Sequence, residues 1–199
     1  MFSFNFIPSI VILSFSIALW ACRPDPNRSF NIPQIEEEVK TLHTQEAKRV
    51  FLEKIIEDDQ RVRDGALSAD LVLKYGHNSK EHRAYIETQI QQDALNLEKI
   101  EMYLKYYGHP GIELGSDAVS APWMVIHHAQ GYEARERNFP LLYRAYKNGI
   151  IDDGAMSFYL GRMHRIKTGE RFDMEGPYTG EDEINALIET LGLSLDESN

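Results

Sequence analysis

The longest regular pattern in the chain is residues 79–108, SKEHRAYIETQIQQDALNLEKIEMYLKYYG. Apolar residues recur in it at spacings of three and four, which places them on one face of an α-helix. Asn78 or Ser79 can cap the start of this helix, and Gly108 followed by Pro110 stops it. The spacing therefore predicts a long amphipathic helix. Its expected inner face consists of Ile86, Ile90, Ala94, Leu97, Ile100 or Glu101, and Leu104.

Similar patterns on both sides of this stretch predict further helices and no strand, because no run alternates with a period of two. Pro140 lies inside one of them and predicts a kink or break near Asn138. The fold class predicted is all-α, a single compact domain of about five to six helices joined by short connections. The other expected helical ranges are 35–60, 68–76 as one or two turns, 120–131, 133–149, 152–169 and 179–191.

Length and composition agree with one globular domain. The chain has 199 residues, of which 43% are apolar and 26% charged, so it can bury a core. Its formal net charge is −10, and Lys and Arg form no basic stripe. Nucleic acid and anionic membrane surfaces require clustered positive charge, so neither is expected as a partner.

The N-terminus has the pattern of a targeting segment. Residues 1–21 contain no charged side chain, and the apolar run is shorter than the about 20 residues that span a bilayer comfortably. It ends in LWAC (19–22), which resembles the lipobox of bacterial lipoproteins, and Cys22 is the only cysteine. We therefore expect lipidation at Cys22, a membrane anchor on the non-cytoplasmic side of a bacterial cell envelope, and a mature chain that begins there. An uncleaved N-terminal anchor is the main alternative.

Three segments follow from this assignment. Residues 1–21 are a lipoprotein-type signal peptide. Residues 22–34 contain three prolines and few apolar side chains, and they are predicted to form a flexible tether. Residues 35–199 form the helical domain.

Several polar residues fall on the predicted apolar faces. Asp59 follows Ile55 by four residues, and Asp93 precedes Leu97 by four, so both carboxylates should point inward. Buried carboxylates are costly unless they are paired. We therefore expect an interior polar cluster. Its candidate members are Asp59, Gln60, Arg63, Asp93, Asn96, His128 and Arg162.

This cluster has two interpretations. It can be a salt-bridge lattice that fixes helix register, or a polar pocket whose titratable groups are shifted toward neutrality. Metal ligation is not expected, because no ligand spacing matches a known pattern and His127 and His128 point about 100° apart on a helix. No serine lies in a nucleophile elbow, and the loop 108–115 lacks the Lys-Ser or Lys-Thr of a phosphate-binding loop. No cofactor is therefore predicted.

The middle of the chain contains several short motifs of polar, glycine and proline residues. They are Asp59-Gln60-x-x-Arg63, Asp93-x-x-Asn96, Gly108-x-Pro110-Gly111, Ile126-x-His128-Ala129, Pro140-Leu141-Leu142 and Arg162. Their order and spacing resemble a bacterial family catalogued as domain of unknown function 6624. The resemblance covers about residues 53–169, and it implies that the interior polar positions belong to the domain. It implies no reaction, substrate or cofactor.

The chain departs from this family at two carboxylate positions. Gln130 and Gly161 stand where the family usually has aspartate, and the usual C-terminal motif is replaced by an added helix over 180–191. Three functions remain open: a module that binds a small molecule or an envelope protein, a hydrolase-like enzyme that uses Asp59, Asp93 and His128, and a purely structural protein. A solvent-accessible cluster would favour the first two functions.

Overall fold

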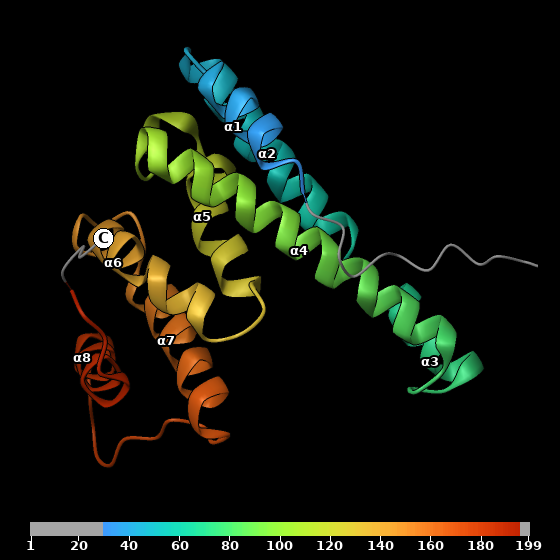
Figure 1. The fold of residues 1–199 in the computed structure, drawn as a ribbon. Coiled ribbons are helices and arrows are strands. Elements are labelled where there is room, and N and C mark those ends of the chain that lie inside the picture. Colours follow the sequence, from blue (N-terminus) through green and yellow to red (C-terminus); the bar gives the residue numbers. More distant parts are fainter. Residues whose placement is uncertain (1–29, 196–199) are drawn as a thin grey trace, which may run out of the picture.

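The computed structural model describes residues 30–195, and these residues confirm the all-α fold (Figure 1). The predicted signal peptide, Cys22 and residues 22–29 of the predicted tether lie outside the described residues. The described residues contain no strand and more helices than the five to six expected. The elements are α1 (Ile32–Lys40), α2 (Gln45–Arg61), α3 (Gly65–Tyr75), α4 (Lys80–Tyr107), the short 3-10 helix η1 (Ile112–Leu114), α5 (Ser116–His128), α6 (Glu133–Lys147), α7 (Asp153–Thr168) and α8 (Gly180–Leu191).

Helix α4 is the long helix predicted from the spacing, and several other helices pack against it. The Ser79 hydroxyl caps it by accepting from the backbone N–H of His82 at 3.1 Å. Gly108 ends it with φ +70°, a conformation that a side chain would strain. Helices α1, α2, α3 and α5 all pack against α4 (Figure 1).

The single helix predicted over 35–60 is wrong, because α1 and α2 are separate helices. The chain leaves the helical conformation at Thr41–Thr44, and the Thr44 hydroxyl caps α2 by accepting from the N–H of Ala47 at 3.0 Å. Threonine hydroxyls compete with helical backbone hydrogen bonds and favour caps over helix interiors. Helix α1 begins at Ile32, so the last residues assigned to the tether are helical.

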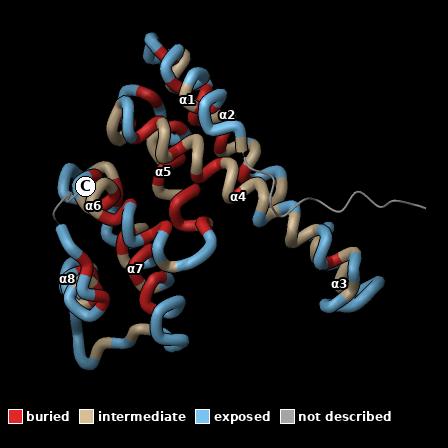
Figure 2. The backbone as a smooth tube through the Cα atoms, viewed as in Figure 1, coloured by how far each residue is buried: buried red, intermediate tan, exposed pale blue. Residues whose placement is uncertain are grey.

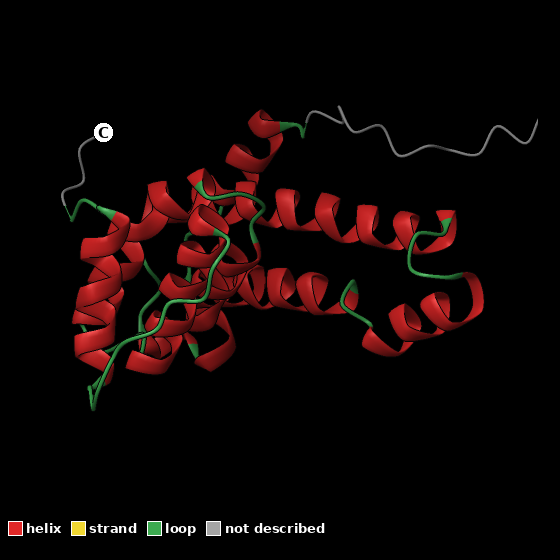
Figure 3. Cartoon of the chain, turned by 90° about the horizontal axis from the view of Figure 1, so that it is seen from below, coloured by secondary structure: helices red, strands yellow, loops and turns green. Residues whose placement is uncertain are grey.

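Helix α3 begins at Gly65, three residues before the predicted range 68–76. The Asp64 carboxylate caps α3 by accepting from the N–H of Leu67 at 3.0 Å, and this aspartate is the signal that the sequence reading missed. None of the residues of α3 is buried. Together with the start of α4 it forms a hairpin that extends beyond the rest of the bundle (Figures 1 and 3).

Two prolines lie inside helices without breaking them. Pro140 is within α6, which is continuous, and α5 starts at Ser116 and contains Pro122 instead of starting at Ser120. Phe139 is fully buried beside Pro140. Tertiary packing of the apolar face supplies most of the stability of such helices. Here it outweighs the loss of one backbone hydrogen bond at each proline.

The core lies between the helix faces that turn toward one another, where buried residues gather (Figure 2). Ile90, which was predicted on the inner face of α4, is 37% exposed, and Phe158 of α7 is 61% exposed. The buried face of α7 is formed by Met156, Tyr159, Leu160, Met163 and His164.

Candidate functional site

The candidate site lies where the C-terminal ends of α2 and α5 meet the middle of α4. We call it the polar cluster. Both helix ends direct backbone carbonyls and the negative end of the helix dipole toward this point, which favours positively charged side chains there. Two aspartates add further negative charge. The polar cluster consists of Asp59, Gln60, Arg63, Asp93, His128 and Gln130.

Asp59, in the last turn of α2, is fully buried and is bound on both oxygens. Its Oδ2 accepts from Gln60 Nε2 at 2.8 Å, and its Oδ1 lies 3.0 Å from Nδ1 of His128. Arg63 Nη2 approaches Oδ1 at 3.3 Å. Three donors thus compensate for the loss of water around this carboxylate.

Arg63, just beyond α2, links the two aspartates. Its Nη2 also contacts Asp93 Oδ1 at 2.5 Å, so one guanidinium serves carboxylates from α2 and α4. Gln130 donates from Nε2 to the other Asp93 oxygen at 3.3 Å. Burial raises the pKa of Asp93, and Arg63 opposes that rise.

The polar cluster is not sealed from solvent. The side chains of Arg63 and His128 are 21% and 22% exposed, whereas those of Asp59 and Asp93 are almost wholly enclosed. Gln60 and Gln130 are exposed at its edge. The two carboxylates therefore lie deepest in the site, and Arg63 and His128 lie nearer to solvent.

His128 has one ring nitrogen fixed and the other open. A carboxylate can only accept, so the contact with Asp59 places a proton on Nδ1. No described residue hydrogen-bonds Nε2, and Nε2 is not among the buried atoms without a partner, so solvent reaches it. Nε2 of a neutral His128 is therefore an accessible acceptor of hydrogen bonds or protons.

Two of the candidate residues are not bonded into the polar cluster. Asn96 is buried on α4, but its Oδ1 accepts from Gln92 at 2.8 Å and its Nδ2 has no partner in the described part of the chain. Arg162 was predicted to point inward because it follows Phe158 by four residues and Tyr159 by three. Tyr159 is buried, but Phe158 and Arg162 are exposed, and Arg162 makes no ion pair with a described carboxylate.

Arg162 nevertheless lies close enough to the polar cluster to interact with its charges. Partial burial lowers the pKa of Arg162, and the neighbouring cations Arg165 and Arg63 lower it further. Asp93 acts in the opposite direction. Arg162 therefore adds positive charge at the edge of the site without being neutralised there.

Arg135 on α6 is a buried cation that the sequence analysis did not identify. It is 1% exposed, and its Nη1 and Nη2 each donate at 2.6 Å, to the carbonyls of Gly131 and His127. Burial lowers its pKa to about 10, and Arg162 adds to that effect. Its position three, four and seven residues before the buried Asn138, Phe139 and Leu142 is the helical spacing that could have revealed it.

His127, rather than His128, is the enclosed member of the histidine pair. It is 3% exposed and lies between the rings of Trp123 and Phe158, with centroid distances of 5.2 and 4.6 Å. Its Nδ1 has no hydrogen-bond partner among the described residues. Burial first, and then the positive charges of nearby arginines, lower its pKa to about 3.

We expect His127 to make the domain sensitive to acid. The unfolded chain binds a proton at this residue near the ordinary pKa of about 6.5, but the folded chain does not, so stability falls as pH drops below that value. Between pH 6.5 and 5 this loss amounts to about 2 kcal/mol. Urea unfolding of wild type and His127→Phe at both pH values measures it, because phenylalanine preserves the ring stack. Parallel pH profiles would contradict the assignment.

No family model matches the chain, and no match was found among curated proteins or solved structures. The resemblance to domain of unknown function 6624 thus stays a prediction from short motifs. Within residues 30–195, no helix has the length and apolarity needed to cross a bilayer. The same residues hold no group of three or more His, Cys, Asp or Glu placed to hold a metal ion.

Proposed function

We propose that the protein is a lipid-anchored binding module of the bacterial cell envelope whose ligand carries an anionic group, either a carboxylate or a phosphate. The observation that supports this most is Arg162, a cation at the edge of the polar cluster with no carboxylate partner among the described residues. Anionic ligands are bound where cations and N–H donors converge without being fully neutralised.

The charge balance of the site supports the same proposal. At the site, Asp59 and Asp93 carry two negative charges, and Arg63 and Arg162 carry two positive charges. Arg63 contacts one oxygen of each carboxylate. Arg135 lies outside the polar cluster and donates hydrogen bonds to backbone carbonyls. The cation without a carboxylate partner among the described residues is therefore Arg162, at the solvent edge of the site.

A screen of small carboxylates and phosphates by thermal shift tests this proposal. Bound at a hundredfold excess over its Kd, a ligand stabilises the protein by about 2.7 kcal/mol. We expect at least one such compound to raise the Tm of wild type and to lose most of that effect in Arg162→Gln. Lys167→Gln, a change on the same helix, is the matched control. Equal shifts of Tm in wild type and Arg162→Gln would show that Arg162 does not bind the anion.

An acid–base enzyme is the second candidate, and the bond between Asp59 and His128 favours it. A buried carboxylate that holds Nδ1–H orients an imidazole so that Nε2 can take and return a proton. Chromogenic ester and phosphate substrates test this candidate. Turnover that is lost in His128→Gln while ligand binding is retained would favour the enzyme over the binding module.

The anchor is a separate part of the proposal and has its own test. We expect metabolic labelling with a fatty acid to mark the wild-type chain at Cys22, because the apolar N-terminal run ends there. Cys22→Ser should remain unlabelled and should leave the membrane fraction. Equal labelling of both chains would show that another residue carries the lipid, and no labelling of either chain would show that the protein is not lipidated.

A further inference from the structure

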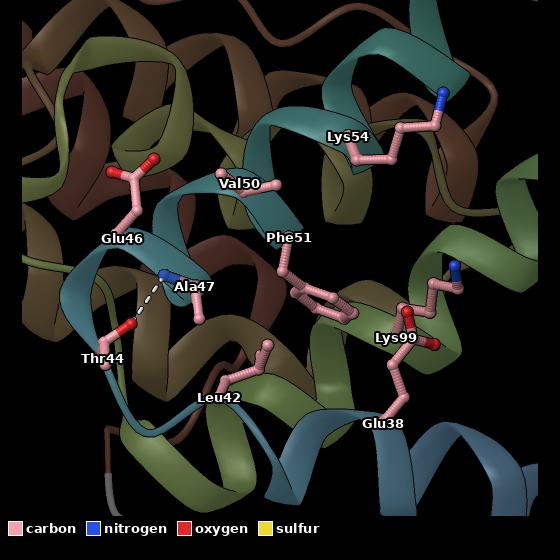
Figure 4. Close-up of a pocket in the computed structure, with 9 residues that line it drawn as sticks. All are labelled: Glu38, Leu42, Thr44, Glu46, Ala47, Val50, Phe51, Lys54 and Lys99. Atoms are coloured by element: carbon pink, nitrogen blue, oxygen red, sulfur yellow. Dashed lines mark hydrogen bonds between the residues drawn. The ribbon is translucent and has the colours of Figure 1, made fainter.

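An apolar pocket of about 490 Å³ lies between α1, α2 and α4, at the opposite end of α2 from the polar cluster (Figure 4). Its wall is formed by Leu42, Ala47, Val50 and Phe51. Pockets for small ligands range from about 300 to 1,000 Å³ and are mostly apolar with few polar groups. The size and lining of this one are within that range.

Part of the apolar wall is exposed to solvent, and covering it with an apolar group of a ligand would be favourable. Val50 is 52% exposed, although it lies on the same helix as the buried Phe51 and lines the same pocket. Phe51 is held in place by stacking against Tyr103 of α4, with ring centroids 6.2 Å apart. The pocket therefore offers a fixed aromatic wall and an exposed branched side chain to an apolar group.

Of the four charged residues that line the pocket, two are already paired along α2. Glu46 binds Arg49 at 2.6 Å, and Lys54 contacts Glu57 and Asp58 at 3.0 and 3.1 Å. The charges of Glu46 and Lys54 are therefore already paired within the protein.

The other two charged residues, Glu38 of α1 and Lys99 of α4, have no ion-pair partner among the described residues. The ammonium of Lys99 lies 5.9 Å from the centre of the Phe51 ring, and Glu38 is exposed. Helices α1 and α4 pack together, and both side chains lie at the α1–α4 side of the pocket, beside the Phe51 ring (Figure 4). One unpaired charge of each sign thus borders an apolar cavity.

We propose that this pocket binds a small zwitterion with an apolar side chain, of the class of aromatic or branched aliphatic α-amino acids. The carboxylate of the ligand pairs with Lys99 and its ammonium pairs with Glu38. The side chain lies against Val50 and Phe51. The site shares no residue with the polar cluster, so this proposal is independent of the anion-binding proposal.

Isothermal titration of L-phenylalanine into the full-length chain in lipid nanodiscs tests the proposal, with empty nanodiscs as the blank. We expect saturable binding by wild type. We expect at least tenfold weaker binding of 3-phenylpropionate, which lacks the ammonium, and of phenethylamine, which lacks the carboxylate. Each analogue loses one charge-assisted hydrogen bond, and a tenfold loss of affinity corresponds to about 1.4 kcal/mol.

Variants assign the binding to this pocket. Lys99→Gln and Glu38→Gln should each weaken L-phenylalanine about tenfold, and Ala47→Trp should abolish binding by filling the cavity. Lys105→Gln, at an exposed position on α4, should bind as wild type does. Far-UV circular dichroism confirms that each variant is folded.

Three results would overturn the proposal. The first is no binding of L-phenylalanine by wild type at millimolar concentration. The second is equal affinity for 3-phenylpropionate, which would assign the pocket to simple amphipathic anions. The third is unchanged binding by a folded Ala47→Trp variant, which would place the ligand elsewhere.

Discussion

Arg135→Ala is expected to lose about 3–5 kcal/mol of unfolding free energy, the largest effect of any single change considered for this domain. The guanidinium is enclosed and caps the C-terminal end of α5 through the carbonyls of His127 and Gly131. Alanine removes both donors, leaves two carbonyls without partners and opens a cavity. Urea unfolding of the fragment that begins at Asn31 measures the change.

Arg144→Ala is the matched control, because it removes an exposed arginine from the same helix. Its cost should stay within about 1 kcal/mol, as for other surface charges. Arg135→Met separates packing from hydrogen bonding, since it fills the space but donates nothing. A cost below about 1 kcal/mol for Arg135→Ala would show that the guanidinium does not hold the end of α5.

Asp59→Ala should cost about 3 kcal/mol, because it leaves Gln60, Arg63 and His128 without their shared acceptor inside the protein. Arg63 keeps its contact with Asp93, which limits the loss. Chemical unfolding near neutral pH measures the change in free energy.

Glu57→Ala is the control for this change, since Glu57 lies on the same helix and is exposed. It should shift the unfolding free energy by about 0.5 kcal/mol at most. If Asp59→Ala and Glu57→Ala unfolded at the same urea concentration, the polar cluster would contribute nothing to the fold.

The fold class and the long helix could be predicted from spacing because both depend on local periodicity and on capping residues. Ser79 and Gly108 mark both ends of α4 without reference to the rest of the chain. The breaks that divide α1 from α2, and the start of α3, depend on single side chains, Thr44 and Asp64. Those residues are common in exposed positions, so their role as caps is evident only in the folded chain.

The polar cluster was partly predictable for the same reason. Asp59 and Asp93 lie on apolar faces at clear helical spacings, and the structure places both in the interior. The prediction for Arg162 relied on Phe158 and Tyr159, but only Tyr159 is buried, because the Phe158 ring stacks on His127 at the surface. Gln130 lies within the helix predicted over 120–131 but follows α5 in the structure, so helical spacing did not identify it.

The pairing of residues across helices could not be read from the sequence. Arg63 reaches a carboxylate thirty residues further along the chain, and His128 reaches one sixty-nine residues earlier. Such contacts depend on which helices pack together, and one sequence offers no information on that choice.

Anion binding at the edge of the polar cluster can be measured by nitrogen-detected NMR of the histidine rings during titration with phosphate and with citrate. We expect a saturable shift of Nε2 of His128 by at least one of the two anions, no comparable shift of the exposed His43, and loss of the His128 shift in folded Arg162→Gln. A His128 signal that stays fixed with both anions, in a protein that remains folded, would contradict anion binding at this edge.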